Sequence, residues 1–194
     1  MLVTRSEMLW GLFVLLCLGS LIAYQGEVGR PAEAPMHWPG GLERGSKFSL
    51  VLLAHPRCPC TDATLRQIER LSPEQREQLK IFVLFVKPPG SAPDFHRASL
   101  WEQSQALSGV VTLCDLDGRW AQAFGCFTSG QALLYGPDGE LRFAGGLTPS
   151  RGHEGDSIGL EAIEQHLAQA KDATRTVAVY GCPLSSEGDQ FCRR

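Results

Sequence analysis

A pair of closely spaced cysteines constrains this chain more than any other feature. Cys58 and Cys60 lie in the segment HPRCPCT at residues 55–61. The residues before it, FSLVLLA at 48–54, are apolar enough to form a buried strand. The residues after it, 62–71, carry leucine and isoleucine at the spacing of one helix face. The sequence therefore predicts two cysteines on a strand-to-helix turn, at the N-terminus of the helix.

A helix N-terminus changes the chemistry of a cysteine placed there. The unpaired backbone N–H groups and the positive end of the helix dipole favour thiolate over thiol. The thiolate is the form that attacks disulfides and binds metals. Pro59 has no N–H and a fixed φ, so it stiffens the spacing between the two cysteines. The alternative is a structural disulfide or two buried thiols, although structural cysteines are rarely so close together at a helix start.

The Cys-x-Cys spacing also bears on how the pair would react. A disulfide across so short a ring is strained, and it is therefore more oxidising and more easily reduced than a relaxed one. Cys58 comes first on the turn, so we predict that it is the more exposed of the two and attacks, while Cys60 resolves. Thr61 is expected to be the helix N-cap.

Five further side chains are candidates for supporting roles. His55 could take a proton or bind a metal, or it could be a strand-end residue held by a hydrogen bond. Arg57 could stabilise a thiolate by its charge, or extend into solvent. Farther along the chain, Arg151 could bind an anionic partner group, and His153 or Glu154 could transfer protons.

The last three of these residues lie in the polar loop 151–156, which follows a predicted hairpin at 132–144. The second strand of that hairpin should return to the end of the sheet that carries the cysteines. We therefore expect the loop to face them. The alternative is a polar loop with no chemical role, in which Asp156 or Ser157 caps the last helix.

An uncharged apolar run at residues 8–24 lies near the N-terminus. It is just long enough to cross a bilayer, Arg5 precedes it, and aromatic residues stand near both ends. A cleaved signal peptide is the alternative, but no A-x-A-like site follows, and Leu16 precedes Cys17 where a lipoprotein site needs a small residue. We predict a single-pass anchor in the cytoplasmic membrane, with the C-terminal domain on the extracytoplasmic, periplasmic side.

The rest of the chain divides into a linker, one domain and a tail. Prolines and glycines indicate a tether at 25–45, in which Trp38 could dock on the domain or stay in solvent. The domain pattern is β, α, β, α, short β, α, β-hairpin, α, and the short strand at 109–113 is followed by a turn at 114–118. This order is that of a thioredoxin-like sheet. The predicted divisions are a cytoplasmic N-terminus at 1–7, the anchor at 8–24, the linker at 25–45, the domain at 46–171 and a cysteine-containing tail at 172–194.

Composition limits the compartment and the partners. Six of the 7 cysteines lie beyond residue 50, which favours an oxidising compartment or a thiol-active protein. Cys114 and Cys126 flank a short helix and could pair. In the tail, Cys182 and Cys192 could clamp the chain, or Cys182 could fold back as a resolving thiol; structural roles are expected for all four. The net charge of −3 gives no indication of a nucleic-acid partner.

The chain resembles the membrane-anchored thioredoxin-like proteins of the TlpA and ResA type and, more narrowly, the RedB-type proteins. The narrower likeness rests on the motifs HPRCPCT, LLYGPDGELRFAGG, SRGHEGDSIG and VYGCPL. The resemblance implies an α/β thioredoxin-like fold, a central mixed sheet with flanking helices behind an N-terminal transmembrane helix, and a redox-active cysteine turn. Two features depart from the thioredoxin pattern. Thr61 stands where the second cysteine of Cys-x-x-Cys would fall, and Ser129-Gly130 stands where a cis-proline would precede the hairpin.

Three function classes remain open at this point. The first is a membrane-tethered thiol-disulfide oxidoreductase that needs no cofactor and acts on protein thiols or disulfides with a redox partner yet to be identified. The second is a metallochaperone-type domain that binds Cu(I) through Cys58, Cys60 and either His55 or His153. The third is a peroxidase of the peroxiredoxin kind, whose T-x-x-C motif neither cysteine of the turn matches.

Overall fold

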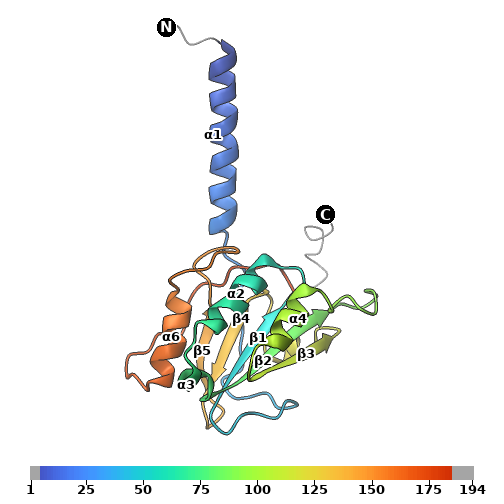
Figure 1. Cartoon of the computed structure of the whole chain (residues 1–194), viewed down its shortest axis with the longest axis vertical. Helices are drawn as coiled ribbons and strands as arrows, with labels where there is room; N and C mark the ends of the chain where they lie inside the picture. Colours follow the sequence, from blue (N-terminus) through green and yellow to red (C-terminus); the bar gives the residue numbers. More distant parts are fainter. Residues whose placement is uncertain (1–4, 185–194) are drawn as a thin grey trace.

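A five-stranded mixed sheet organises the domain (Figure 1), and the computed structural model describes residues 5–184. The strand order is β3-β2-β1-β4-β5. The first three strands run parallel, while β4 runs antiparallel to β1 and β5 antiparallel to β4. The bounds are β1 Phe48–Ala54, β2 Leu79–Lys87, β3 Val110–Leu116, β4 Gln131–Tyr135 and β5 Leu141–Gly146. The succession of strands and helices along the chain is the one that the sequence pattern predicted.

Both faces of the sheet are covered, which explains why β1 is apolar throughout. On one face, alternate residues of the central strands pack with leucines and isoleucines of α2 and α6 and with α4. On the other, Val51, Leu53 and their neighbours pack against α5 and against the segment before β1. The helix bounds are α1 Arg5–Gly26, α2 Pro59–Glu69, α3 Pro73–Arg76, α4 Ser99–Ala106, α5 Arg119–Ala123 and α6 Ile158–Leu167.

The third strand is longer than predicted. Residues 114–116, assigned to a turn, continue the parallel pairing with β2 as far as Lys87↔Leu116. Asp115, a turn-forming residue by propensity, lies buried at the end of this strand. Its carboxylate accepts hydrogen bonds from the N–H groups of Trp120 at 2.7 Å and Ala121 at 2.9 Å. The aspartate therefore satisfies donors of the first turn of α5, a role that sequence propensity alone did not indicate.

The segment before β1 is docked on the domain rather than extended in solvent. Trp38 packs edge-on against the rings of Phe124 and Tyr135, with centroid distances of 5.2 Å to each. The Glu33 N–H donates to the carbonyl of Gly125 at 2.8 Å. The segment thus forms part of the second face of the core, although it has almost no regular secondary structure.

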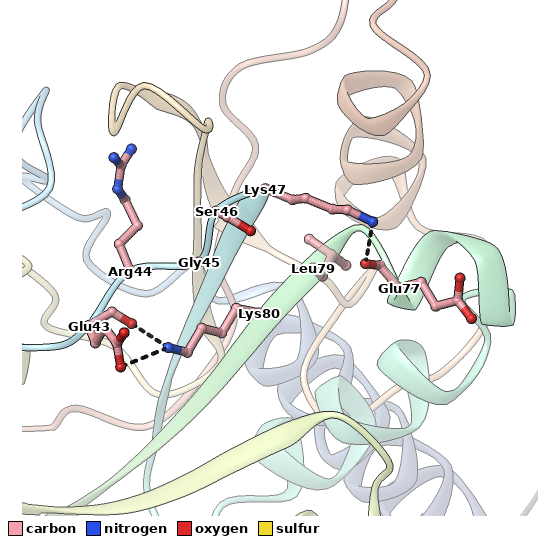
Figure 2. A pocket seen from close by; sticks show the side chains of 8 residues that line it. All are labelled: Glu43, Arg44, Gly45, Ser46, Lys47, Glu77, Leu79 and Lys80. Atoms are coloured by element: carbon pink, nitrogen blue, oxygen red, sulfur yellow. Dashed lines mark hydrogen bonds and ion pairs between the residues drawn. The ribbon is translucent and has the colours of Figure 1, made fainter.

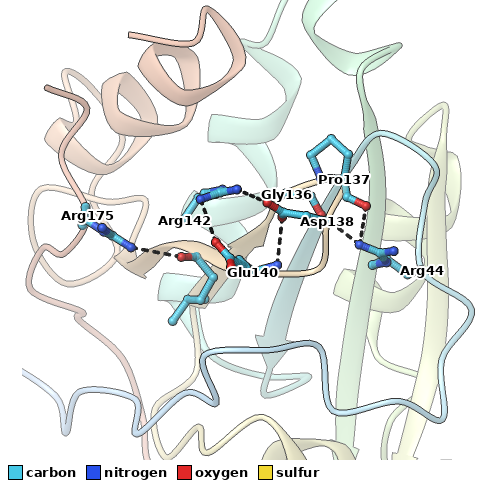
Figure 3. A network of polar contacts seen from close by, with 8 residues as sticks. Arg44, Gly136, Pro137, Asp138, Glu140, Arg142 and Arg175 are labelled. Atoms are coloured by element: carbon cyan, nitrogen blue, oxygen red, sulfur yellow. Dashed lines mark hydrogen bonds and ion pairs between the residues drawn. The ribbon is translucent and has the colours of Figure 1, made fainter. Parts of the chain in front are cut away.

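Two arginines hold the β4–β5 turn in place (Figure 3), and one of them, Arg44, comes from the segment before β1. Arg44 donates to the carbonyl oxygens of Gly136 at 3.3 Å and of Pro137. Arg142 pairs with the carboxylates of Asp138 and Glu140 on the turn itself. This network lies at the end of the sheet opposite the cysteines, so we assign it a structural role.

The C-terminal segment runs beside β5 and continues to the cysteine end of the sheet. The Ala144 N–H donates to the Arg175 carbonyl at 2.9 Å, and the Gly146 N–H donates to the Ala178 carbonyl at 3.2 Å. Val179, 1% exposed, anchors the segment before it turns toward the loop that precedes β4. The tail therefore covers part of a sheet edge that would otherwise be open.

The first helix, α1, projects away from the sheet (Figure 1). It has 22 residues with a mean hydropathy of 1.9 in its most apolar window, and it is long and apolar enough to cross a membrane. Its C-terminal end adjoins the loop after β5, because the Arg151 N–H donates to the Gln25 carbonyl at 3.3 Å. The Arg151 guanidinium also lies 3.8 Å from the Glu27 carboxylate.

Candidate redox site

The cysteine turn forms directly after β1, as predicted. The Cys58 N–H donates to the His55 carbonyl at 3.2 Å, which closes the turn. Cys58 itself is the N-cap of α2, with φ −93° and ψ 124°, and Pro59 is the first helical residue. The N-cap prediction for Thr61 was wrong. Proline favours the N1 position, so the helix begins at Pro59, two residues before Thr61. The Thr61 hydroxyl instead donates to the His55 carbonyl at 3.1 Å.

Both sulfur-bearing side chains of the turn are buried. Cys58 is 0% exposed and Cys60 is 1% exposed. The prediction that Cys58 would be the more exposed of the two was therefore wrong. The segment that covers Cys58 is the tail around Cys182, which contacts the Cys58 sulfur.

Hydrogen bonds stabilise the thiolate form of Cys58. Its sulfur receives hydrogen bonds from the Cys182 thiol, from the Cys60 thiol, and from the backbone N–H groups of Cys182 and Thr61. These donors hold the pKa of Cys58 far below its ordinary value, against the opposing effect of burial. Cys58 is therefore the sulfur best prepared to exist as a thiolate.

Cys60 has the opposite preference. Its thiol donates to the Cys58 sulfur, and this bond, together with burial and the nearby negative charge, raises the pKa of Cys60 well above its ordinary value. The Gly152 N–H, 3.3 Å from the Cys60 sulfur, and the positive charge of Arg151 act in the other direction. The hydrogen bonds thus favour the thiolate at Cys58 and the thiol at Cys60.

The loop after β5 faces the turn, as predicted, but its side chains are arranged unevenly. Gly152 reaches Cys60 through its N–H group, a contact that no side-chain motif could have indicated. Arg151 is mostly buried, with 12% of its side chain exposed, and its charge acts on Cys60. His153 is exposed and its Nδ1 is 2.8 Å from the Arg151 carbonyl. Glu154 pairs with Arg66 at 3.1 Å. Of the three predicted side chains in this loop, only Arg151 therefore acts on a cysteine.

His55 and Arg57 contact each other, and both contact Phe95. The buried His55 ring accepts the Arg57 N–H at Nδ1, at 3.3 Å, and packs edge-on against Phe95. The Arg57 guanidinium lies over the same Phe95 ring, 5.4 Å from its centroid. Within residues 5–184 no group of three or more His, Cys, Asp or Glu side chains is arranged to hold a metal ion.

Ser129 is the central residue that the sequence analysis noted only as the place of a missing proline. Its hydroxyl accepts the His55 N–H at 2.8 Å and lies 2.7 Å from the Thr61 hydroxyl oxygen. Its backbone N–H donates to the Cys182 carbonyl at 2.8 Å. The loop before β4 thus faces the turn, where thioredoxins place their cis-proline, and here it joins the strand end, the helix and the tail. No peptide bond in the described part of the chain is cis.

Ser129→Ala is expected to lower the free energy of unfolding by about 1–3 kcal/mol, because the buried His55 N–H loses its acceptor. Urea unfolding of the purified full chain in detergent, followed by tryptophan fluorescence, measures the change. Ser46→Ala is the matched control, since Ser46 is exposed and should change the value by less than about 0.5 kcal/mol. Equal values for the two variants would contradict the role given to Ser129.

The remaining cysteines differ in their surroundings. Cys114 and Cys126 are both free thiols, so the suggested pair is not formed. Burial raises the pKa of Cys126, whose thiol donates to the Phe124 carbonyl at 3.5 Å, and it packs as a small apolar residue. Cys182 reaches the turn, as in the alternative that the sequence left open, although a structural role was the favoured expectation. Cys192 lies outside the described residues.

A separate hollow lies at the opposite end of the sheet (Figure 2). Charged side chains line it, and its two lysines are held by backbone carbonyl groups of the neighbouring glutamates. Lys80 bonds to the Glu43 carbonyl at 2.7 Å, and Lys47 bonds to the Glu77 carbonyl at 3.2 Å. Because these cations already have partners, the hollow is not the candidate site.

Comparison with known proteins supports the fold. No family model and no curated protein matches the chain. Among solved structures, an uncharacterized conserved protein from Geobacillus kaustophilus aligns with a TM-score of 0.60 at 13% identity, over 83% of this chain and 91% of that one. A hypothetical protein from Sinorhizobium meliloti aligns with a TM-score of 0.59 at 18% identity, over 82% and 93%. This chain has a thioredoxin-like fold.

A weaker match is a secreted disulfide oxidoreductase from Mycobacterium tuberculosis, described as homologous to DsbE of E. coli. It has a TM-score of 0.43 and 11% identity, over 64% of this chain and 82% of that one.

Proposed function

We propose that the protein is a thiol-disulfide oxidoreductase that reacts through Cys58 and Cys60. The observation that carries the proposal is the arrangement of hydrogen bonds at the pair, which lowers the pKa of Cys58 and raises that of Cys60. A nucleophile with a stabilised thiolate beside a protonated partner thiol is the arrangement that exchange requires. A merely structural pair has no need of it.

The reaction follows from this geometry. The Cys58 thiolate attacks one sulfur of a substrate disulfide, and the other sulfur leaves as a thiolate. Cys60 then gives up its proton, which protonates the substrate thiolate already released, and attacks the Cys58 sulfur of the mixed disulfide. This step releases the second substrate thiolate and leaves a Cys58–Cys60 disulfide. The substrate is reduced by two electrons and the cysteine pair is oxidised by two. The Gly152 N–H and the Arg151 charge favour the Cys60 thiolate in this second step, in which Cys60 attacks.

The purified full chain in detergent is expected to accelerate the reduction of insulin disulfides by dithiothreitol, because a larger fraction of Cys58 than of the reagent's thiols is thiolate at neutral pH. The measurement is the turbidity of the released insulin chains. Cys114→Ser, at a half-buried thiol outside the site, is the control and should keep the wild-type rate. Metal analysis of the same reduced sample separates the alternative. The metallochaperone hypothesis would be favoured by two results together: a rate equal to the uncatalysed one, and a tightly held Cu(I) that is lost in Cys58→Ser.

We further propose that α1 anchors the domain on the outer side of the cytoplasmic membrane. A reporter enzyme that is active only outside the cytoplasm, fused after Arg194, should be active and should stay with membranes during a high-salt wash. The helix length and hydropathy motivate this expectation. Two lysines in place of Leu12 and Leu16 should lower the membrane-bound fraction of the fusion, since charges at the bilayer centre are costly. An active but soluble wild-type fusion would indicate a cleaved signal instead.

A further inference from the structure

The tail residues 181–184 lie against the cysteine turn in the way that a bound peptide substrate would. The Ser129 N–H donates to the Cys182 carbonyl at 2.8 Å, and the Leu184 N–H donates to the Phe127 carbonyl at 2.9 Å. Thr128 and Pro183 form an antiparallel bridge between these two bonds. The tail is therefore paired, backbone to backbone, with the loop that lies opposite the cysteines.

The register of this pairing brings a sulfur to Cys58. The Cys182 thiol and the Cys182 backbone N–H both hydrogen-bond to the Cys58 sulfur. Cys182 is half-buried, whereas Cys58 is 0% exposed and Cys60 is 1% exposed. Of these three residues, Cys182 is thus the most exposed to solvent.

The close approach of the tail depends on a glycine. A Cβ built on Gly181 would lie 1.9 Å from the Ser129 carbonyl oxygen, a distance that real Cβ atoms do not show. Val179 and Leu184, 1% and 5% exposed, hold the tail on either side of Cys182. Small and apolar residues therefore fix the position of Cys182 over the turn.

We propose that Cys182 is a third redox cysteine, which forms an intramolecular disulfide with Cys58 in exchange with the Cys58–Cys60 disulfide. This inference rests on the proposed function of the turn and names a further participant in it. The tail acts as a built-in substrate, which covers the nucleophile and competes with external disulfides for it. Release of the tail then sets access to Cys58.

The exchange step needs no external oxidant. Starting from the Cys58–Cys60 disulfide, the Cys182 thiol loses its proton and its sulfur attacks the Cys58 sulfur. The Cys58–Cys182 bond forms, the Cys58–Cys60 bond breaks, and the Cys60 sulfur leaves as a thiolate that takes up a proton. One disulfide and one thiol are present before and after the step, so no net oxidation occurs. In the same way, Cys182 can displace a partner from a mixed disulfide at Cys58.

Disulfide mapping of the oxidised full chain tests the proposal. The background is Cys192→Ser, because trypsin leaves Cys182 and Cys192 on one peptide, 176–193. In this background, Cys60→Ser is oxidised with oxidised glutathione, quenched in acid, alkylated and digested. Most molecules should carry the 58–66 peptide joined to the 176–193 peptide. Cys182→Ser in place of Cys60→Ser should carry no link between these peptides.

A second variant changes the position of the tail without removing a thiol. Gly181→Ala, combined with Cys60→Ser and Cys192→Ser, should lower the yield of the linked peptides several-fold and raise the glutathione adduct on Cys58. Circular dichroism of each variant confirms that the domain is folded. Folded Cys60→Ser protein that gives only the glutathione adduct would overturn the proposal.

The insulin assay separates this inference from the proposed function. Turnover by the wild type without any Cys58–Cys182 link in folded Cys60→Ser protein would overturn the role of Cys182 alone. The link without turnover by the wild type or by Cys182→Ser would support a disulfide between the tail and the turn, and would overturn the oxidoreductase activity. The expected result is both the link and turnover, with faster turnover by Cys182→Ser because its tail no longer competes for Cys58.

Discussion

Cys58→Ser is expected to lower the rate of insulin reduction by two orders of magnitude or more, about the effect of removing the nucleophile from a catalytic unit. Four hydrogen bonds converge on the Cys58 sulfur. The serine hydroxyl has a pKa far too high to replace it as a nucleophile. Cys114→Ser is again the control, and a Cys58→Ser rate within a few-fold of the wild type would contradict the assignment.

Trapping experiments divide the roles among the remaining sulfurs. If Cys58 attacks, a variant that lacks the resolving thiols should stay covalently attached to its partner. Because Cys182 also reaches Cys58, Cys60→Ala alone should trap less than Cys60→Ala combined with Cys182→Ala. Cys58→Ala should trap least, since the Cys60 thiol is buried and its pKa is raised. Non-reducing gels of each variant expressed in its native membrane measure the adducts. Trapping mainly by Cys58→Ala would reverse the roles.

The sequence predicted the sheet well because its strands are marked by composition. β1 and β2 are almost continuously apolar, as strands buried on both faces must be, and the turn between β4 and β5 carries a strong glycine and proline signal. The end of β3 was missed because Asp115 is polar and its neighbours resemble a turn. Its burial is compensated by backbone donors of α5, which a local pattern does not reveal.

The candidate site was predicted in part. The cysteine turn and the facing loop followed from the order of the elements, since that order fixes which chain ends meet at one edge. The contact of Gly152 with Cys60 is made by a backbone N–H group, and it has no side-chain signature. The cover over Cys58 comes from a tail without periodicity, more than a hundred residues away in sequence. One signal was present: the tail motif YGCPL combines a glycine, which allows close approach, with a cysteine and a proline.

The pH dependence of Cys58 is the second large effect that we expect. An ordinary thiol is deprotonated to only about one part in three thousand at pH 5. Because hydrogen bonds lower the pKa of Cys58, its thiolate persists as the pH falls and is lost only below the lowered pKa. The rate at which the reduced chain reacts with 4,4′-dithiodipyridine at Cys58 should therefore change by less than about tenfold between pH 8 and pH 5, whereas that of an ordinary thiol should fall by about a thousandfold.

The tail provides the internal control for this prediction. Cys182→Ala removes the thiol donor that contributes most to the lowered pKa of Cys58, while the backbone N–H of residue 182 and the Cys60 thiol remain available. The pKa of Cys58 should therefore rise, and the reaction at pH 5 should slow relative to that at pH 8. Cys182→Ser keeps an O–H donor at the same position and should retain more of the wild-type pH profile. A tail that merely shields Cys58 would change the rate by the same factor at every pH, because steric access does not depend on protonation. A change in the shape of the profile, restored in part by serine, is therefore the signature of a sulfur that stabilises the Cys58 thiolate.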